Sequence, residues 1–456
     1  MGNVERRWAE FVVETKADSV PATALAAAGR SVFDGIGCML AAAGDPAVQP
    51  AVGLALAEGG GGDASVVGTG VRTAPGPAAF ANGTLTHWLE FDDGRGACGH
   101  PASVLLPTAL AVGEPRGVTG HDLLVAYAVG LEAATHISDA CTYEEKNSGF
   151  HRTALFGTIG ATAVAARLAG LDAGQTMMAL GIAGSMGSGV CQNFGTFTKP
   201  LHAGLSARNA VSAVRLASQG WTGSENILAG AAGWAAAYTT DFDYPAMTRD
   251  LGAEWRTADS PPMWKAFPCC GGSHGPLTSL LALIAEHGFT YRDVAEIEVG
   301  APYDSMVMMY GEPDSGYQGK FSLRYTIATA LIDGRIDLDS FTDDKLRRPE
   351  YAEVTARLRI NLTSKWDLAV GGAGTDAKRF KPGDGLPVVV RLTSGQTLTR
   401  STPHIPGLQT DEQVLAKFRG NAGRTLPADR VEAAVRQWST PEEIADLGAA
   451  MAAVTV

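Results

Sequence analysis

The chain has 456 residues, of which 45% are hydrophobic and 18% are charged, and its formal net charge at pH 7 is −12. This length predicts two domains, and the composition is that of a folded protein. A negative field repels phosphate backbones, so we expect no nucleic-acid partner. The N-terminus carries charges throughout, and no apolar run reaches the roughly 18 residues of a membrane helix, so we expect a cytoplasmic protein with no membrane partner.

Apolar residues recur at helical spacing between residues 21 and 220, with glycine or proline at the stops, and this pattern predicts an all-helical first half. After about residue 270 the pattern changes. Segments 294–302 and 355–363 alternate like strands, and "LPVVVRLTSGQTLTRST" (386–402) predicts a hairpin that turns near Ser394 and Gly395.

Helical signals return after residue 403. We therefore predict a mainly α protein. Its large all-helical domain comprises residues 1–269 and 404–456, and a smaller α+β domain comprises residues 270–403.

The segment "HWLEFDDGRGACGHP" (87–101) is the first candidate for chemistry. A helix is predicted to end at "EFDD", and a glycine-rich loop then delivers His100 just before Pro101, which can start the next helix. Asp92 and Asp93 could bind a cation, orient a histidine or cap a helix. A solvated turn is the alternative interpretation.

Two further candidates stand at predicted helix starts. His151 precedes a long apolar helix, whose dipole would disfavour the charged imidazole and lower its pKa toward that of a usable base. Lys199 and His202 open the next helix, and a lysine near the amide-rich start is favoured there when an anion lies between them. The alternatives are a packing histidine and a surface lysine.

The segment "KAFPCCGGSHG" (265–275) pairs two cysteines with two glycines and a histidine. A zinc site is disfavoured because adjacent side chains diverge and no second cysteine pair is present. A vicinal disulfide would be strained. We predict instead a tight turn at 268–273 that exposes backbone N–H groups beside a helix starting near Pro276. Lys265 and His274 would then face an anion, and the cysteines would mostly pack.

Tyr325, in "KFSLRYTIATALIDG", is expected near a helix start in the smaller domain. It could act in a site or be a core tyrosine with its hydroxyl bound to the backbone. No GxGxxG after a strand, no GxxxxGK[ST] and no GxSxG occurs. The sequence therefore predicts acid/base chemistry performed by side chains, with no cofactor and no metal.

In sequence order, seven stretches resemble the MmgE/PrpD family, which includes 2-methylcitrate dehydratase, cis-aconitate decarboxylase and iminodisuccinate epimerase. They are "EFDDGRGACGHPASVLLPTALA", "GFHRTALFGTIGA", "ALGIAGSMGSG", "GTFTKPLHAG", "WKAFPCCGGSHG", "KFSLRYTIATALIDGRI" and "KFRGNAG". The resemblance extends over nearly the whole chain. The resemblance implies a homodimer, a large helical domain, a smaller α+β lid and an active site between the two domains.

The resemblance also implies which residues line that site. The catalytic set is His100, His151, Asp93, Tyr325 and Lys199, and the substrate-binding set is Lys265, His274, Lys199, Cys270 and Gly271. His151 and His100 would form the base and acid pair, Asp93 would orient one imidazole, and Tyr325 would donate a proton. Lys199, Lys265 and the amides of the 269–273 turn would stabilise charge on a substrate carboxylate.

The expected activity is that of a lyase acting by proton transfer at a carbon alpha to a carboxylate of a small di- or tricarboxylate. Dehydration of a 2-methylcitrate-like acid is our first expectation, and decarboxylation of a cis-aconitate-like acid uses the same groups. An iminodisuccinate-type epimerase and a non-catalytic carboxylate-binding protein are the alternatives. Many relatives carry threonine where this chain has Gly94, so the substrate stays open.

Overall fold

A computed structural model describes residues 4–141, 149–239, 241–301, 310–362, 386–402 and 407–456. The chain forms two compact units. Unit 1 comprises Met1–Gln192, Phe197–Trp264 and Gln409–Val456, and unit 2 comprises Asn193–Thr196 and Lys265–Leu408. The sequence-based boundaries at 269/270 and 403/404 lie close to these, but residues 193–196, 265–269 and 404–408, which the sequence predicts in the large domain, belong to unit 2.

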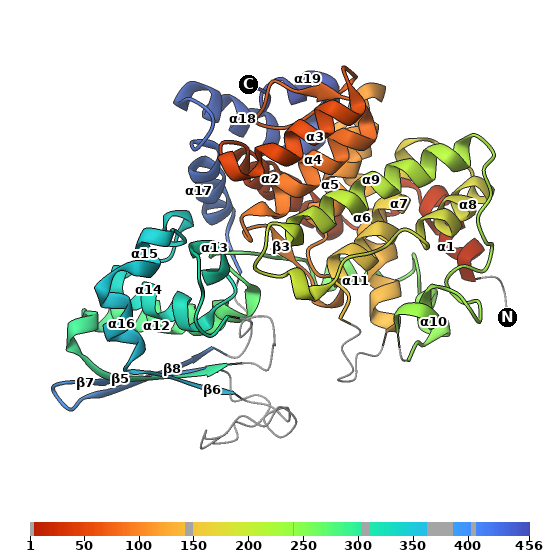
Figure 1. Cartoon of the computed structure of the whole chain (residues 1–456). Helices are drawn as coiled ribbons and strands as arrows, with labels where there is room; N and C mark the ends of the chain where they lie inside the picture. Colours follow the sequence, from red (N-terminus) through yellow and green to blue (C-terminus); the bar gives the residue numbers. More distant parts are fainter. Residues whose placement is uncertain (1–3, 142–148, 240, 302–309, 363–385, 403–406) are drawn as a thin grey trace. The chain divides into compact units, whose positions relative to one another are not determined.

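Unit 1 is built of helices (Figure 1). They are α1 (Val4–Glu14), α2 (Ala22–Ala43), α3 (Gln49–Gly59), α4 (Pro75–Trp88), α5 (Ala102–Gly113), α6 (Gly120–Ala140), α7 (Arg152–Leu168), α8 (Ala173–Ala183), α9 (Thr198–Ser218), α10 (Trp234–Tyr238), α11 (Arg256–Asp259), α17 (Asp411–Ala422), α18 (Ala428–Trp438) and α19 (Leu447–Met451). Two short antiparallel ribbons interrupt them, namely β1 (Ala64–Ser65) with β2 (Arg72–Thr73) and β3 (Asp93–Gly94) with β4 (Met263–Trp264). The prediction of a large helical domain is confirmed, with these ribbons as its small β component.

The core of unit 1 depends on small residues where helices cross. Helix α4 packs on α9, and a Cβ added to Gly83 would lie 2.8 Å from Gly204 Cα, which is closer than real side chains approach. Glycine at both positions therefore allows the two backbones to touch. From this crossing, the last turn of α4 carries His87 and the first turn of α9 carries Lys199.

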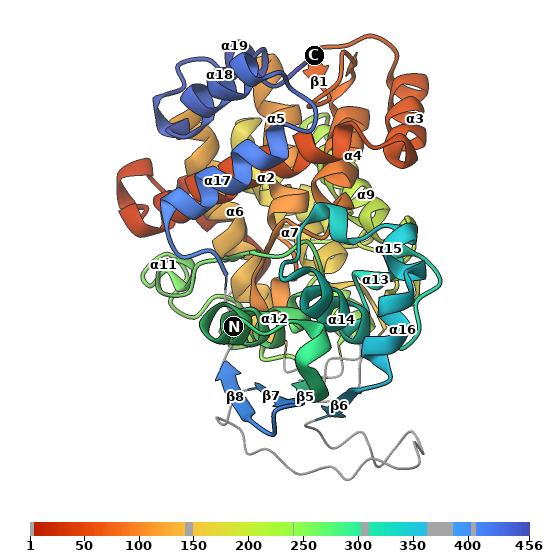
Figure 2. The same ribbon diagram turned by 90° about the vertical axis from the view of Figure 1, so that its left-hand side faces the viewer.

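The C-terminal helices close unit 1. Figure 2 shows α17 lying along α2. The Phe418 ring stacks on Phe33 with centroids 4.0 Å apart and an interplanar angle of 8°. Helix α2 is long and apolar enough to cross a membrane by length and composition, which is weak evidence by itself, and 78% of its most apolar window is buried inside the structure. This helix therefore serves as a core helix that the C-terminal segment covers.

Unit 2 contains a four-stranded mixed sheet in the order β6-β5-β7-β8, formed by β5 (Val294–Ala301), β6 (Leu358–Leu362), β7 (Leu386–Leu392) and β8 (Thr397–Thr402). Strands β5 and β6 are parallel, and the other pairs are antiparallel. The helices are α12 (His274–His287), α13 (Gly316–Gly319), α14 (Leu323–Asp333), α15 (Asp343–Arg347) and α16 (Pro349–Thr355). Helix α12 packs on β7 and β8, and both views show the helices on one side of the sheet.

The predicted strands and hairpin of unit 2 are present, but the second strand begins at Leu358 and not at residue 355, because Thr355 ends α16. The turn lies where expected, with Gly395 at φ +90°, a conformation that favours glycine, and with its N–H donating to the Leu392 carbonyl. Residues 302 and 363 of the predicted strands lie outside the described residues. Helix α12 begins at His274, ahead of the expected start near Pro276.

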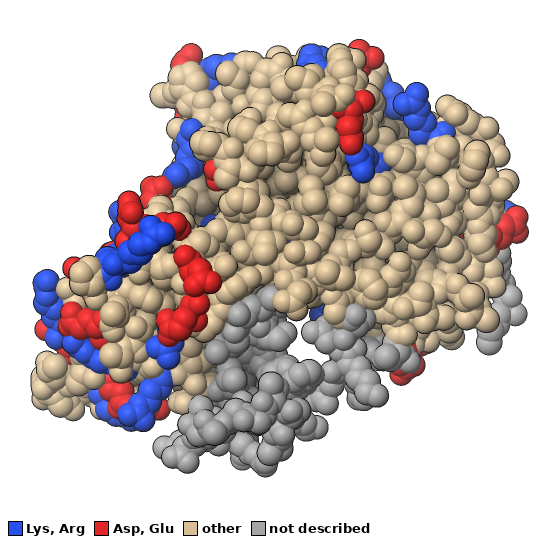
Figure 3. Space-filling view, in the orientation of Figure 1, with Lys and Arg blue, Asp and Glu red and all other residues tan. Residues whose placement is uncertain are grey.

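Figure 3 shows how charge is distributed on one face of the molecule. The surface of unit 1 around α9 is mostly without charged side chains in this view, whereas both signs gather over unit 2. Exposed pairs in unit 2 include Arg347 with Asp343 and Arg335 with Asp337. Mixed signs of this kind do not form the basic stripe typical of nucleic-acid binding.

Candidate active site

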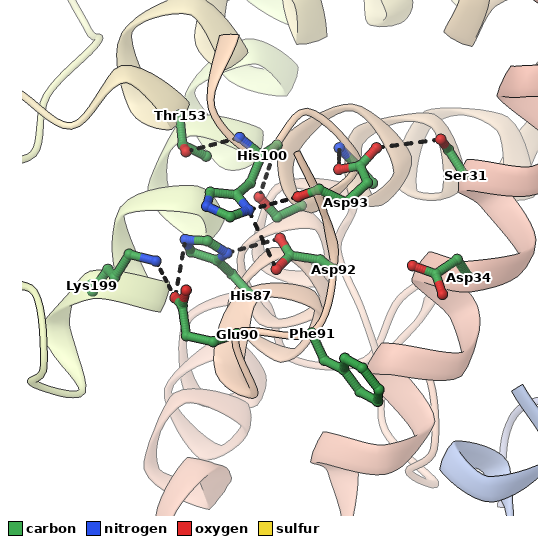
Figure 4. Close-up of polar contacts among 12 residues, drawn as sticks. Ser31, Asp34, His87, Glu90, Phe91, Asp92, Asp93, His100, Thr153 and Lys199 are labelled. Carbon is green, nitrogen blue, oxygen red and sulfur yellow. Dashed lines mark hydrogen bonds and ion pairs between the residues drawn. The ribbon is translucent and has the colours of Figure 1, made fainter. Parts of the chain in front are cut away.

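The main cluster of buried polar side chains lies in unit 1, around the segment Leu89–His100, which we call the acid loop. Helix α4 ends at Trp88, earlier than predicted, and Glu90 has φ +55°, a left-handed conformation that is uncommon outside glycine and turns the chain. Glu90 is 1% exposed, and its carboxylate forms an ion pair with the Lys199 ammonium (Figure 4). The surface-lysine alternative is therefore wrong, because an anion beside Lys199 is supplied by the protein itself.

Two imidazoles lie around one carboxylate of the acid loop (Figure 4). They belong to His87, in the last turn of α4, and to His100, at the end of the acid loop. His87 Nδ1 lies 2.8 Å from Asp92 Oδ2, and His87 Nε2 lies 3.9 Å from Glu90 Oε1. His100 Nδ1 lies 3.6 Å from Asp92 Oδ1 and 2.6 Å from the Asp93 carbonyl oxygen. Because a carbonyl only accepts, His100 Nδ1 carries the proton, and in the neutral ring Nε2 is the nitrogen able to accept one.

The Asp93 carboxyl group faces away from the imidazoles. Its Oδ1 accepts the Ala102 N–H at the start of α5 (3.0 Å), and its Oδ2 accepts from the Ser31 hydroxyl (3.3 Å). Complete burial, followed by the neighbouring Asp92, raises the pKa of Asp93 from 3.8 to about 8. The orienting role predicted for the Asp93 carboxylate therefore falls to Asp92, and Asp93 contacts His100 through its backbone carbonyl.

His151 caps the start of α7 and is buried. Its Nδ1 lies 3.2 Å from His202 Nδ1 in α9, and its ring stacks on His87 with centroids 5.6 Å apart. Burial, followed by the charge of Lys199, lowers the pKa of His151 well below 6.5, and the same two causes together with His87 lower that of His202 to about 4. The direction is the one predicted for His151, but burial and not the helix dipole is the main cause.

A hydrogen bond between the acid loop and α7 connects the two sides of this cluster. The Thr153 hydroxyl, in the first turn of α7, accepts the His100 backbone N–H at 3.1 Å (Figure 4). This bond joins the end of the acid loop to the helix that presents His151. His100 and His151 are thus held by adjacent segments, as a base and acid pair requires.

The donor types around Asp92 include those of a metal site, since ligand atoms of His87, Asp92 and His100 lie within 4.8 Å of one another. The His100 Nδ1 proton is donated to the Asp93 carbonyl, so only His100 Nε2 has a lone pair for a metal ion, and His87 Nδ1 is already bonded to Asp92 at 2.8 Å. The contacts present are those of a hydrogen-bonded acid–imidazole cluster, and the expected lack of a metal stays a prediction.

A turn is present at Pro268–Ser273 in unit 2, and we call it the glycine turn. The predicted exposure of its backbone N–H groups is not found at Cys269, Cys270 and Ser273, because these N–H groups donate to carbonyl oxygens of the protein. Its Ser273 N–H donates to the Cys270 carbonyl, and the Cys270 N–H donates to the Lys320 carbonyl, both at 3.0 Å. The Lys320 ammonium donates to the Pro268 carbonyl at 3.0 Å, so Lys320 holds the turn at two points. Gly271 opens its short 3-10 segment (Gly271–Ser273), and Cys269 and Cys270 are buried, consistent with packing.

The other candidates of unit 2 are also buried. Lys265 and His274 are both 0% exposed, and His274 Nε2 donates to the Phe267 carbonyl at 3.1 Å. The Tyr325 hydroxyl donates to the Ser340 carbonyl at 2.7 Å, and burial raises the pKa of Tyr325 to about 12. This geometry matches the alternative of a core tyrosine, because the proton that it would transfer is already bound to the backbone.

Sequence reasoning missed Glu90 and His87 as site residues and singled out Asp93 in place of Asp92. The available signal was spacing: His87 and Glu90 stand three residues apart at a helix end, directly before the two aspartates. Which of two adjacent aspartates faces an imidazole depends on backbone direction, and Asp93 is turned away because it begins the short β3–β4 ribbon, paired with Trp264.

Gly94 marks an open position beside this cluster. A Cβ there would meet Met263 Cε at 3.7 Å and the Gly99 carbonyl oxygen at 3.8 Å, which are ordinary contacts. A Cβ would therefore fit at this position of the acid loop.

A mainly helical unit with a buried set of acids, imidazoles and a lysine, joined to a small α+β unit, defines a two-domain protein equipped for acid/base chemistry. Residues 6–247 match the MmgE/PrpD N-terminal domain, and residues 267–440 match the MmgE/PrpD C-terminal domain. The chain therefore belongs to the MmgE/PrpD family.

Named relatives fall in one activity class. The chain is 27% identical over 397 residues to cis-aconitate decarboxylase of Homo sapiens, which covers 82% of this chain and 78% of the relative. It is also 27% identical over 482 residues to the cis-aconitate decarboxylase-like protein oryM of Aspergillus oryzae, covering 98% and 96% of the two chains. An identity of 27% supports membership of the family and a lyase-like activity class. It does not identify the substrate.

Proposed function

We propose that this protein is a cofactor-independent lyase that handles a proton at a carbon alpha to a carboxylate of a small di- or tricarboxylate. Decarboxylation of a cis-aconitate-like acid is the first reaction to test, because the named relatives are cis-aconitate decarboxylases. Dehydration of a 2-methylcitrate-like acid, our expectation from the sequence, is the second.

The observation that carries the proposal is the buried His151 imidazole near the Lys199 charge. With a pKa well below 6.5, His151 is neutral at pH 7 and able to accept a proton. Lys199 is 1% exposed, and in so dry an environment its charge can stabilise negative charge that develops on a substrate carboxylate. Neighbouring imidazoles of His100 and His202 complete a set that can both accept and return protons.

The chemical steps balance with these groups alone. In decarboxylation the C–CO₂ bond breaks, its electron pair is delocalised toward a remaining carboxylate near Lys199, and an imidazolium that has taken up a proton from solvent donates it to carbon. In dehydration a neutral imidazole removes the alpha proton, the C–O bond breaks, and the hydroxyl leaves as water after accepting a proton. Decarboxylation needs an acid and a cation, dehydration needs a base as well, and neither needs an added oxidant or reductant.

A panel of pure acids tests the proposal. Cis-aconitate, 2-methylcitrate and an epimerisable amino dicarboxylate are incubated with the protein in D₂O, and the masses of the products are determined by mass spectrometry. Loss of CO₂ or water supports the lyase. Deuterium uptake with the carbon skeleton intact supports the epimerase, and binding measured by calorimetry without any product supports a non-catalytic protein and refutes the proposal. His151→Ala, purified in parallel, controls for contaminating enzymes.

Three further expectations stay predictions beside this one: the homodimer, the cytoplasmic location and the contribution of Lys265, His274, Cys270 and Gly271 to substrate binding. The first is tested by light scattering. The last is tested by the Lys265→Met variant, for which we expect weaker substrate affinity.

A further inference from the structure

The C-terminal motif "KFRGNAG" (417–423) is a sequence signal that the candidate site has not explained. It lies in α17, which packs on α2 within unit 1. Its first residue, Lys417, has a side chain only 4% exposed. A buried ammonium requires partners, and these partners show what the motif does.

Lys417 contacts the acid loop directly, although the two segments are 326 residues apart. Its ammonium donates to the Phe91 carbonyl oxygen at 2.5 Å and lies 4.0 Å from the centroid of the Phe91 ring. The same nitrogen is 2.7 Å from Asp34 Oδ1 in α2. Lys417 therefore ties one peptide of the acid loop to α2 and α17.

The peptide group that Lys417 contacts, that of Phe91, connects the two carboxylates of the acid loop. Phe91 stands between Glu90, which pairs with Lys199, and Asp92, which contacts His87 and His100. In Figure 4, Phe91 points away from the imidazoles, toward the side on which Asp34 lies. Any rotation of this peptide would move both carboxylates at once.

The charged groups around Lys417 also indicate that it belongs to the surroundings of the acid loop. The Cys38 thiol has its pKa raised first by burial and then by Asp34, with further contributions from Asp92 and Asp93, whereas Lys417 acts in the opposite direction. These three carboxyl groups thus share one buried neighbourhood with Lys417. Its positive charge offsets the negative charges of Asp34 and Asp92 where water is excluded.

We propose that Lys417 is a positioning residue: through the Phe91 carbonyl and Asp34 it fixes the acid loop so that Glu90 and Asp92 face Lys199 and the two imidazoles. The C-terminal segment thereby completes the site without touching the substrate.

The test compares four variants of the full-length protein. Lys417→Met removes the charge, Lys417→Arg keeps it, and the double variant Asp34→Asn with Lys417→Met removes the buried pair together, which protects folding if the single variant is unstable. Arg419→Met is the matched control, because Arg419 lies on the same helix and pairs at the surface with Glu432.

Two readouts are taken from folded variants. Histidine ¹³Cε1 resonances report the surroundings of the imidazoles without any substrate. Turnover of cis-aconitate, or of whichever acid the panel identifies, separates kcat from KM; only this readout rests on the proposed function. If the wild-type protein turns over none of the acids, the proposed function fails and the resonances alone decide the role of Lys417.

We expect the double variant to shift the His87 and His100 resonances and to lower kcat by about tenfold or more, because small misplacements of catalytic groups cost up to about 10²-fold. KM should change little, Lys417→Arg should recover most of the loss, and Arg419→Met should match the wild type. A folded double variant with wild-type resonances and wild-type kcat would overturn the proposal.

Discussion

The acid loop of unit 1 and the glycine turn of unit 2 hold their candidate residues in different ways. In the acid loop, ionisable side chains contact one another: Glu90 pairs with Lys199, and Asp92 lies beside His87 and His100. In unit 2, the side-chain hydrogen bonds described for Lys320, His274 and Tyr325 go to backbone carbonyls. Under the proposed function, unit 1 would supply the proton chemistry, and the glycine turn would supply a backbone anchored by hydrogen bonds.

One device is nevertheless common to both regions. Lys417 donates to the Phe91 carbonyl of the acid loop and lies over the Phe91 ring. Lys320 donates to the Pro268 carbonyl of the glycine turn and lies over the Phe341 ring at 4.4 Å. A buried lysine therefore anchors a loop in each unit, since an ammonium can satisfy an inward-facing carbonyl that water cannot reach.

Substitutions of Glu90 and Lys199 should have the largest effect, because this ion pair is the main contact between ionisable side chains in unit 1. Lys199→Met should lower kcat by about 10²-fold or more, since a preorganised charge is removed. It should also destabilise the protein by about 3–5 kcal/mol, because the Glu90 charge is left buried. Steady-state kinetics and thermal melting measure both effects.

The double variant Glu90→Gln with Lys199→Met separates the two effects of this substitution. It should regain stability but not turnover, because neutral partners can stay buried together. If Lys199→Met keeps kcat and raises only KM, Lys199 contributes uniform binding and the assignment is wrong.

His151→Ala is expected to lower kcat by about 10²–10⁴-fold, the range for loss of a general base or acid. The surface residue His121 provides the control His121→Ala, which should be neutral. Because the pKa of His151 lies well below 6.5, its neutral form persists into acid, and the part of kcat/KM that depends on it should not decline until the pH falls below about 6.5. Full turnover by His151→Ala would remove this residue from the mechanism.

Asp93→Asn addresses the carboxyl group that faces away from the imidazoles. With a folded-state pKa of about 8 against 3.8, Asp93 retains its proton in the folded protein as the pH rises, whereas the unfolded chain has released it. Its contribution to stability is therefore present below pH 4 and is lost as the pH rises through 8. Between pH 5 and pH 9, the free energy of unfolding of the wild type should fall by about 1 kcal/mol or more relative to that of Asp93→Asn. This corresponds to a fall of about 2–4 °C in Tm.

A constant difference in Tm between the two proteins across this pH range would show that Asp93 does not hold a proton in the folded state. The Ser31→Ala variant gives an independent check, since it removes the hydroxyl that donates to Asp93.

Tyr325→Phe should have the smallest effect. Its hydroxyl donates to the Ser340 carbonyl inside unit 2, so its loss should cost about 1 kcal/mol of stability and leave kcat within about threefold. A fall in kcat of about 10²-fold would instead restore the role in proton donation that the sequence first suggested. Urea unfolding and steady-state kinetics on the same preparation distinguish the two.

Local pattern was sufficient for much of this protein. The 3.6-residue periodicity identified the helices of unit 1, alternation identified β5 and β6, and the Ser394–Gly395 pair identified the hairpin. The same signals placed His100 beside Pro101, His151 at the start of α7 and Lys199 in the first turn of α9. These features depend on backbone conformations that a few neighbouring residues encode.

Only the tertiary structure decided which side chains meet. Glu90 and Lys199 are 109 residues apart, and they pair because glycines let α4 and α9 cross in contact. Asp93 holds its proton because it is buried beside Asp92, and Lys417 reaches Phe91 because α17 packs on α2. Contact and burial arise from the packing of segments that are distant in the sequence, so the spacing of residues within one segment predicts neither.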